Sequence, residues 1–240
     1  MAATHYLQAL EVQRTANRIV SILGAKTPHI QNLTPGGVTN AINMDSQSTL
    51  TLERLWAIKA LIDQLGDFIN NAMMPDVAAV GALYADWTGH GAGVMNYLSV
   101  PDLPLDETGS TFSMPGGWIP GGDLAAFRPI PTFQDEFFRA GVKEAVNHSW
   151  YSYAGAAGGL HPFEGETSPG FTDFQDDGKY SWIKAPRWRG HAMEVGPLSR
   201  YVIGYAQNNP EFKEPVDKLL KDLGLPLKAI FSTLGRTAAR

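Results

Sequence analysis

The sequence predicts a mainly α-helical protein, a bundle of long helices that carries small β-meanders. Two patterns support this fold class. Apolar residues recur every three or four positions over long stretches towards both ends of the chain. Between them, residues 89–131 are dense in glycine and proline and contain only short apolar runs. No internal repeat or change of composition marks a boundary, so residues 1–240 are expected to form one domain.

The first helix is predicted over residues 4–24, with Gly24 at the position of a C-cap. Its periodic apolar positions are Ala9, Val12, Ala16, Ile19 and Leu23. Leu7, Leu10 and Val20 widen the apolar arc, which is typical of a helix buried among other helices.

A loop rich in turn residues is expected over 25–45, followed by a long helix from about Ser48 to Met74 that Ser46 or Ser48 could cap. Pro75 should kink this helix or divide it from a second helix over 76–87, because proline lacks the N–H that an interior helical position donates. Length and pattern together favour a long helix covered on several sides.

Short strands and tight turns are expected in the region 89–131, where Gly116-Gly117 and Gly121-Gly122 flank Trp118 and Ile119. A helix is predicted over 132–149 with Thr132 as its cap, then a glycine-rich loop over 150–180 and a short strand from Tyr180 to Lys184. Helices should fill 197–207, 211–223 and 227–240, separated at Asn209-Pro210 and Leu225-Pro226.

Composition excludes several classes of function. The net charge of -5, with both signs interspersed, does not match a nucleic-acid-binding surface. The chain has no apolar run of about 18 residues, so no membrane span is predicted. The first residues also lack the basic and apolar regions of a signal peptide. Because the chain contains no cysteine, it can form neither a disulfide nor a thiolate metal site.

Common catalytic motifs are also missing. The glycine pairs lack the lysine and helix start of a phosphate-binding loop, and no GxSxG elbow occurs. The six histidines show no HExxH pattern or close-spaced pair, so a metal site built from histidine alone is not expected.

The most informative stretch is YSWIKAPRWRGHAMEVGPLSR, residues 180–200. Pro186 restricts its own backbone and biases Ala185 towards an extended form, so the Arg187 side chain extends from a stiff backbone. A guanidinium held in this way is a good fixed donor for an anion or polar ligand. The residues alone favour the plainer interpretation, in which Arg187 pairs with a buried acid or stacks on Trp188.

Taken with other segments, this stretch resembles the large subunit of nickel-iron hydrogenases, most closely the membrane-bound uptake group. The matching segments, in the order of the family, are HYLQALEVQR (5–14), GAKTPHIQNLTPGGVTNA (24–41), DFINNAMMPD (67–76), SMPGGWIPGGDL (113–124), NHSWY (147–151), LHPFEGET (160–167), residues 180–200 and STLGR (232–236). The block APRW…MEVGPL is the most specific of them.

The resemblance implies an enzyme that reversibly oxidises molecular hydrogen to protons and electrons. In the family, nickel and iron are held by four cysteine thiolates from two CxxC motifs, and iron also carries carbon monoxide and cyanide. Electrons leave through an iron-sulfur small subunit. Such a protein would lie peripherally at the bacterial cell membrane, on the periplasmic side, and reach the membrane only through its partners.

The resemblance also implies roles for particular residues. The family's APR motif maps onto Ala185, Pro186 and Arg187, which makes Arg187 the candidate catalytic residue over the open position of the metal pair. Pro186 would line the same pocket. His161 and Glu194 match family positions without an assigned step, and for Glu194 a buried salt bridge is expected.

Both CxxC motifs are absent, so the chain itself offers no cysteine ligand for the nickel-iron centre. The first pair should lie before residue 1 and the last after residue 240, and both ends of the chain look cut. We therefore expect the middle portion of a large subunit, a single incomplete domain that is inactive alone. The alternative is a naturally cysteine-free, metal-free homologue that acts as a scaffold or docks a partner.

Overall fold

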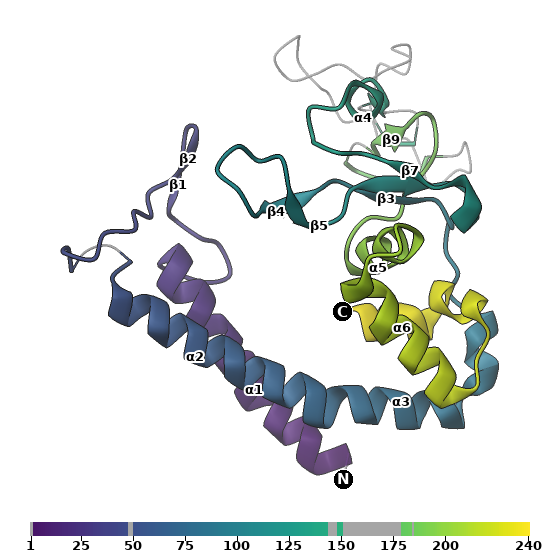
Figure 1. Cartoon of the computed structure of the whole chain (residues 1–240), viewed down its shortest axis with the longest axis horizontal. Helices are drawn as coiled ribbons and strands as arrows, with labels where there is room; N and C mark the ends of the chain where they lie inside the picture. Colours follow the sequence, from purple (N-terminus) through teal and green to yellow (C-terminus); the bar gives the residue numbers. More distant parts are fainter. Residues whose placement is uncertain (1, 48–49, 144–147, 151–178, 184) are drawn as a thin grey trace. The chain divides into compact units, whose positions relative to one another are not determined.

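The computed structural model describes residues 2–47, 50–143, 148–150, 179–183 and 185–240 (Figure 1). The chain divides into two compact units, Met1–Leu83 and Tyr84–Arg240. Both units consist of helices and small antiparallel sheets, as the sequence predicts. Within the described part of the chain, no helix is both long enough and apolar enough to cross a bilayer.

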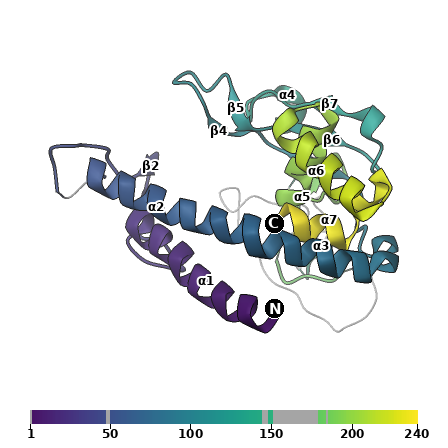
Figure 2. The same cartoon turned by 60° about the horizontal axis from the view of Figure 1, so that its bottom comes forward.

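The first unit is built around two long helices, α1 (Ala2–Gly24) and α2 (Leu52–Phe68), which lie side by side (Figure 2). Ile58 and Leu61 are the buried positions of α2, one turn apart on the face that packs. The loop between the helices holds a two-residue hairpin, β1 (Leu33–Thr34) and β2 (Gly37–Val38). The first predicted helix is therefore confirmed.

The second predicted helix is confirmed with a different start and a defect at its end. Thr51 caps α2, because its hydroxyl accepts a hydrogen bond from the Arg54 N–H at 3.3 Å, so the predicted serine cap is wrong. A π-helical turn (Ile69–Met73) separates α2 from α3 (Met74–Leu83). Pro75 follows this turn, and the wider π geometry accommodates a residue that cannot donate to the preceding turn.

A three-stranded antiparallel sheet in the second unit confirms the predicted meander. Its order is β3 (Tyr97–Ser99), β6 (Gly117–Ile119) and β7 (Arg128–Pro129). Beside it, β4 (Asp102–Pro104) and β5 (Phe112–Met114) form a hairpin. Two 3-10 turns, Ala85–Gly89 and Leu124–Ala126, complete this region.

Helices α5 (Pro197–Ala206) and α6 (Pro210–Leu223) match two predicted helices. The Asn209 carboxamide oxygen accepts a hydrogen bond from the Glu211 N–H at 3.0 Å and so caps α6, which ends at Gly224 in a left-handed conformation. The single helix predicted over 227–240 is wrong. Extended backbone at Ser232 separates a 3-10 turn (Leu227–Phe231) from α7 (Thr233–Ala239).

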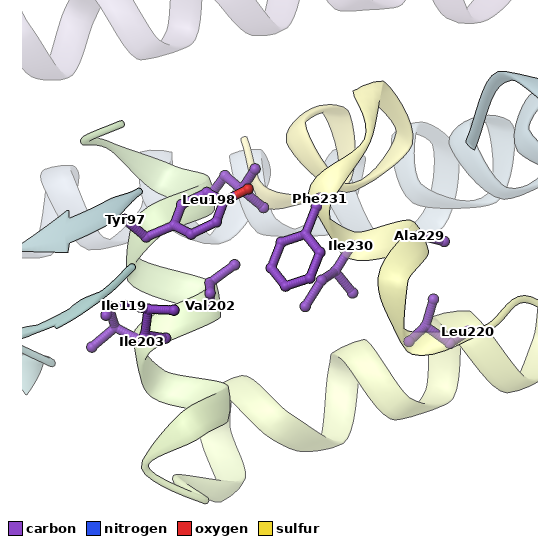
Figure 3. Close-up of a cluster of buried hydrophobic side chains, with 9 residues drawn as sticks. All are labelled: Tyr97, Ile119, Leu198, Val202, Ile203, Leu220, Ala229, Ile230 and Phe231. Carbon is purple, nitrogen blue, oxygen red and sulfur yellow. The ribbon is translucent and has the colours of Figure 1, made fainter. Parts of the chain in front are cut away.

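The core of the second unit lies between the sheet and the C-terminal helices (Figure 3). Its buried members are Tyr97, Ile119, Leu198, Val202, Ile203, Leu220, Ala229, Ile230 and Phe231. The rings of Tyr97 and Phe231 stack with centroids 5.5 Å apart, which joins β3 to the last 3-10 turn. Residues from opposite ends of this unit therefore form one core.

The helix predicted over 132–149 is wrong. The structure contains only a short helix α4 (Glu136–Arg139), capped by Asp135, followed by β8 (Val142–Lys143); residues 144–147 lie outside the described residues. Strand β8 pairs with β9 (Arg187–Trp188). Pairing with a strand distant in sequence overrides the local helical pattern of Phe133, Phe137 and Val142.

Candidate functional site

The segment 180–200 contains a tight hairpin at residues 188–191. The sequence predicted a strand earlier in this segment, over residues 180–184. Trp188 and His191 exchange backbone hydrogen bonds at 3.1 and 2.9 Å, and Arg189 and Gly190 both have positive φ. This is the geometry of a two-residue hairpin turn of type I′. The strand predicted from Tyr180 to Lys184 is wrong: Ser181 makes an isolated bridge to Ser149, Lys184 lies outside the described residues, and the strand is β9.

Arg187 is half-buried on β9, and its guanidinium donates hydrogen bonds to three protein oxygens. Its Nη2 donates to the Tyr180 hydroxyl at 2.6 Å, and its Nη1 donates to the carbonyl oxygens of Ala185 and Pro186 at 3.0 and 3.2 Å. Among the described residues it forms no ion pair with an acid. The guanidinium within reach of the Trp188 ring, at 5.3 Å, belongs to Arg189. Within the part of the chain that the structure describes, Arg187 therefore neither pairs with an acid nor stacks on Trp188.

Pro186 is exposed and directly precedes β9, as the stiff entry to that strand requires. Trp188 and Arg189, which follow Arg187, are held by hydrogen bonds to the segment 138–141. The Arg189 N–H donates to the Gly141 carbonyl at 2.8 Å, and the Trp188 indole N–H donates to the Phe138 carbonyl at 3.0 Å. A side chain at Gly141 would meet the Trp188 indole at 2.5 Å. The backbone that presents Arg187 is thus fixed at both ends.

Glu194 forms the salt bridge that the sequence led us to expect. Arg236 binds its carboxylate in bidentate fashion, with Nε at 3.0 Å from Oε1 and Nη2 at 2.5 Å from Oε2. The same guanidinium donates to the carbonyl oxygens of Ala92 and Phe231 at 3.0 and 3.2 Å. The pair therefore ties the 194–200 segment, the loop before β3 and α7 together.

Tyr97 lies beside this ion pair and is fully buried. Its hydroxyl has no hydrogen-bond partner among the described residues. Burial, and then the charge of Glu194, raise the pKa of Tyr97 to about 12, whereas Arg236 acts in the opposite direction. The phenol is therefore neutral near neutral pH.

The described residues do not provide the ligands of a nickel-iron centre. The chain has no cysteine, and no three histidine, aspartate or glutamate side chains in the described ranges gather as metal ligands would. Soft thiolates are the expected ligands of such a centre. His161 lies outside the described residues, as does the whole LHPFEGET segment.

Known proteins with the same sequence pattern identify the family. A family model described as nickel-dependent hydrogenase matches residues 1–240. The chain belongs to this family. Among hydrogenase relatives, it is 43% identical over 246 residues to the Hydrogenase-2 large chain of Escherichia coli K12, and 46% identical over 261 residues to the uptake hydrogenase large subunit of Rhizobium leguminosarum bv. viciae. Each comparison covers 100% of this chain but only 43% of the relative.

Solved structures of hydrogenases have the same fold. The nickel-iron-selenium hydrogenase of Desulfovibrio vulgaris Hildenborough matches with a TM-score of 0.72 and 31% identity, over 98% of this chain and 45% of that one. The enzyme of Desulfomicrobium baculatum gives a TM-score of 0.70 at 28% identity. The hydrogenase fold therefore extends over nearly the whole chain, which spans less than half of these relatives.

Sequence reasoning missed two features of this region. Arg236 was quoted only within STLGR, and nothing in its spacing from Glu194 indicates that the two residues meet. Arg128 and Arg189 both lie against the Phe137 ring, although the three residues belong to three different elements. The basic character of WRG was the only visible signal.

Proposed function

We propose that these 240 residues are the middle portion of the catalytic large subunit of a nickel-iron hydrogenase, which reversibly oxidises molecular hydrogen to protons and electrons. The family match over residues 1–240 carries this proposal. The alternative, a cysteine-free scaffold, is not favoured, because the matched relatives are named as hydrogenase large chains.

The parent subunit would hold the nickel-iron centre, with carbon monoxide and cyanide on iron, through cysteines outside these residues. Sequencing the gene outwards from the codons of Met1 and Arg240 tests this directly. An open frame on both sides with a CxxC motif in each flank is the expected result. A start and a stop codon at these positions would contradict the proposal and favour the scaffold.

Within the parent, we propose that Arg187 acts at the active-site pocket and that Pro186 lines its wall. A guanidinium remains protonated near neutral pH, so its contribution would be electrostatic and positional. Three of its N–H groups already bond to protein oxygens. These bonds hold the side chain in place and support a role in which a fixed positive charge faces the reaction.

The substitution Arg187→Lys tests this role in the parent enzyme. Lysine keeps the charge but loses the planar fork, so we expect hydrogen oxidation to fall by about 10- to 1000-fold while nickel stays bound. Arg139→Lys is the matched control, because Arg139 is exposed and its guanidinium donates to the Gln134 side chain. Near-normal turnover of Arg187→Lys would refute the assignment.

The observed contacts also favour a second role, in which Arg187 stabilises the turn before β9. The variant Tyr180→Phe separates the two roles, because it removes the hydroxyl that accepts at 2.6 Å and leaves the guanidinium intact. If the charge itself matters, Tyr180→Phe should retain most activity. If Arg187 is structural, both variants should lower the melting temperature and the activity together.

The parent would pass its electrons to an iron-sulfur small subunit and lie peripherally at the bacterial cell membrane, on the periplasmic side, through that partner. The name uptake hydrogenase of several relatives supports this assignment. Co-purification with an iron-sulfur subunit, and loss from membranes when that subunit is deleted, are the expected results. A large subunit that stays on membranes without any partner would contradict it.

We also propose that α1, α2 and α3 belong to a larger helical bundle in the parent and that residues 1–240 are one incomplete domain of it. Large apolar side chains on these helices support this, since they are exposed without a cover. The most exposed are Tyr6, Leu7, Leu52, Trp56, Ile62, Val80 and Leu83.

A further inference from the structure

Two arginine guanidiniums lie against a single aromatic ring in the second unit. The guanidinium carbon of Arg128 is 3.3 Å from the centroid of the Phe137 ring, and that of Arg189 is 4.0 Å from it. Arg128 comes from β7, Phe137 from α4 and Arg189 from the turn after β9. Three separate segments thus build this cluster of Arg128, Phe137 and Arg189, called here the arginine-phenylalanine cluster.

The ring at the centre of the cluster is held firmly. Phe137 contacts Trp118 and Trp188, with ring centroids 5.9 and 5.1 Å away. Trp188 is only 3% exposed, and the register of β6 and β7 places Trp118 opposite Arg128. The two guanidiniums are therefore carried by a rigid aromatic base and not by a flexible loop alone.

The positive charges of the cluster lack acidic partners within the described residues. Neither Arg128 nor Arg189 forms an ion pair there. The Arg189 guanidinium donates a hydrogen bond to the Phe137 carbonyl at 3.3 Å. Two acids, Asp135 and Glu136, directly precede Phe137 in the sequence. Asp135 accepts a hydrogen bond from the Phe138 N–H as a helix cap, and Glu136 forms no ion pair among the described residues.

One further basic residue lies on the short helix that carries Phe137. This residue is Arg139, two positions after Phe137 on α4. The chain as a whole carries a net charge of -5. Positive charge concentrated at one place in an acidic chain favours the binding of a negatively charged ligand there.

The chemistry of the cluster fits carboxylates. Stacking on a ring leaves the edge of a guanidinium, with its N–H donors, available for bidentate binding. A carboxylate matches that fork and neutralises a charge that the ring only partly stabilises. Two such forks close to one ring would bind an acidic stretch of polypeptide better than an isolated acid.

We propose that the arginine-phenylalanine cluster docks an acidic segment of the large-subunit polypeptide that lies outside residues 1–240. The chain covers only 43% of the related large subunits, so more than half of such a polypeptide is available to cover it. A segment of the same chain is present at high effective concentration, which favours it over a separate partner. The inference rests on the proposed parent subunit but not on its activity.

Carbodiimide cross-linking of the full-length parent enzyme, in complex with its partner, tests the proposal. The variants Arg128→Lys and Arg189→Lys supply an amine at each position, and the reagent joins that amine to a carboxylate in direct contact. Arg139→Lys is the control on the same short helix, because Arg139 bonds to Gln134 and lies two positions from Phe137, on a different side of α4. Hydrogen oxidation by each variant is measured separately, so a failed parent function is distinguished from a failed docking site.

The expected result is a cross-link from both introduced lysines, and not from the control, to an aspartate or glutamate of the same polypeptide outside residues 1–240. Its yield should fall at high salt, which screens the attraction that forms the pair. Cross-links only to the partner subunit, only to acids within residues 1–240, or none above the control would each overturn the proposal, even in a fully active enzyme.

Discussion

At the scale of single residues, the bond between Glu194 and Arg236 has the clearest energetic consequence. The side chains are only 18% and 23% exposed, so removal of one partner leaves a poorly solvated charge. We expect Glu194→Gln to lower the free energy of unfolding of the parent subunit by about 2–3 kcal/mol, somewhat less than for a fully buried pair. Urea unfolding measures this loss.

A double-mutant cycle with Arg236→Met is the control for that prediction. If the pair acts as a unit, the loss in the double variant should be clearly smaller than the two single losses together, because the uncompensated charge is gone. Additive losses would show that the two side chains act independently and would contradict the structure.

Asp106 gives a prediction of pH dependence. In the turn between β4 and β5 its carboxylate accepts hydrogen bonds from the hydroxyls of Thr108 and Thr111, as well as from the Ser110 and Thr111 N–H groups. These bonds hold the pKa of Asp106 well below its ordinary value of 3.8, and the hydroxyls of Thr108 and Thr111 have the largest effect.

Because this pKa is lowered by folding, the turn gains stability that is fully present above pH 3.8 and is lost as the pH falls through the folded pKa. NMR titration of the Thr108 and Thr111 amides should therefore show a midpoint clearly below 3.8. In Asp106→Asn this transition should vanish. A midpoint at or above 3.8 would contradict the hydrogen-bonded turn.

Sequence reasoning reached some of these residues and not others. A salt bridge at Glu194 was predictable, because an acid within the apolar run MEVGPL needs a partner. The identity of that partner was not, since Arg236 lies 42 positions away, in α7. The bonds of Arg187 to the Ala185 and Pro186 carbonyls depend on the backbone conformation around Pro186, which the sequence does not specify.

At the scale of elements, the crossing of α5 and α6 depends on Gly204. A Cβ there would lie 2.4 Å from Cγ of Phe212, a residue that is itself buried. We expect Gly204→Ala to lower the free energy of unfolding by about 1–3 kcal/mol, because the two helices must separate or Phe212 must leave its rotamer. Thermal unfolding of the parent subunit measures this.

The matched control is Gly66→Ala. Gly66 lies inside α2, and no atom is within 4 Å of a Cβ built there. Alanine is the better helix former, so this variant should gain about 0.5–1 kcal/mol. Equal effects at both glycines would show that close packing at Gly204 is unimportant.

The elements that were predicted correctly are those set by local signals. Helices α1, α5 and α6 have strong periodicity, and glycine or Asn-Pro marks at least one end of each. The prediction of a helix over 132–149 was wrong, because the same spacing of apolar residues is compatible with a different structure. Phe137 packs on Trp118 and Trp188, and Val142 pairs with Trp188 across two strands.

At the scale of the whole molecule, the chain exposes more apolar surface than a stable monomer tolerates. Trp56 is 60% exposed and Leu7 64% exposed on the two long helices. We expect the isolated 240-residue chain to aggregate, with elution at the void volume in size-exclusion chromatography. A sharp monomer peak with cooperative melting would refute this, and co-expression with the rest of the parent subunit should restore solubility.

The contacts of α7 have a consequence for synthesis on the ribosome. The Arg236 side chain bonds to the carbonyl of Ala92, 144 positions earlier, and the Thr233 N–H bonds to the carbonyl of His90. Phe231 from the same region covers Tyr97. Contacts between residues so far apart in sequence form late in synthesis. Part of the apolar face of the sheet around Tyr97 therefore stays uncovered until the C-terminal residues of this unit have left the exit tunnel. Translation speed and chaperone access over that interval would then determine how much of the nascent protein reaches the native state.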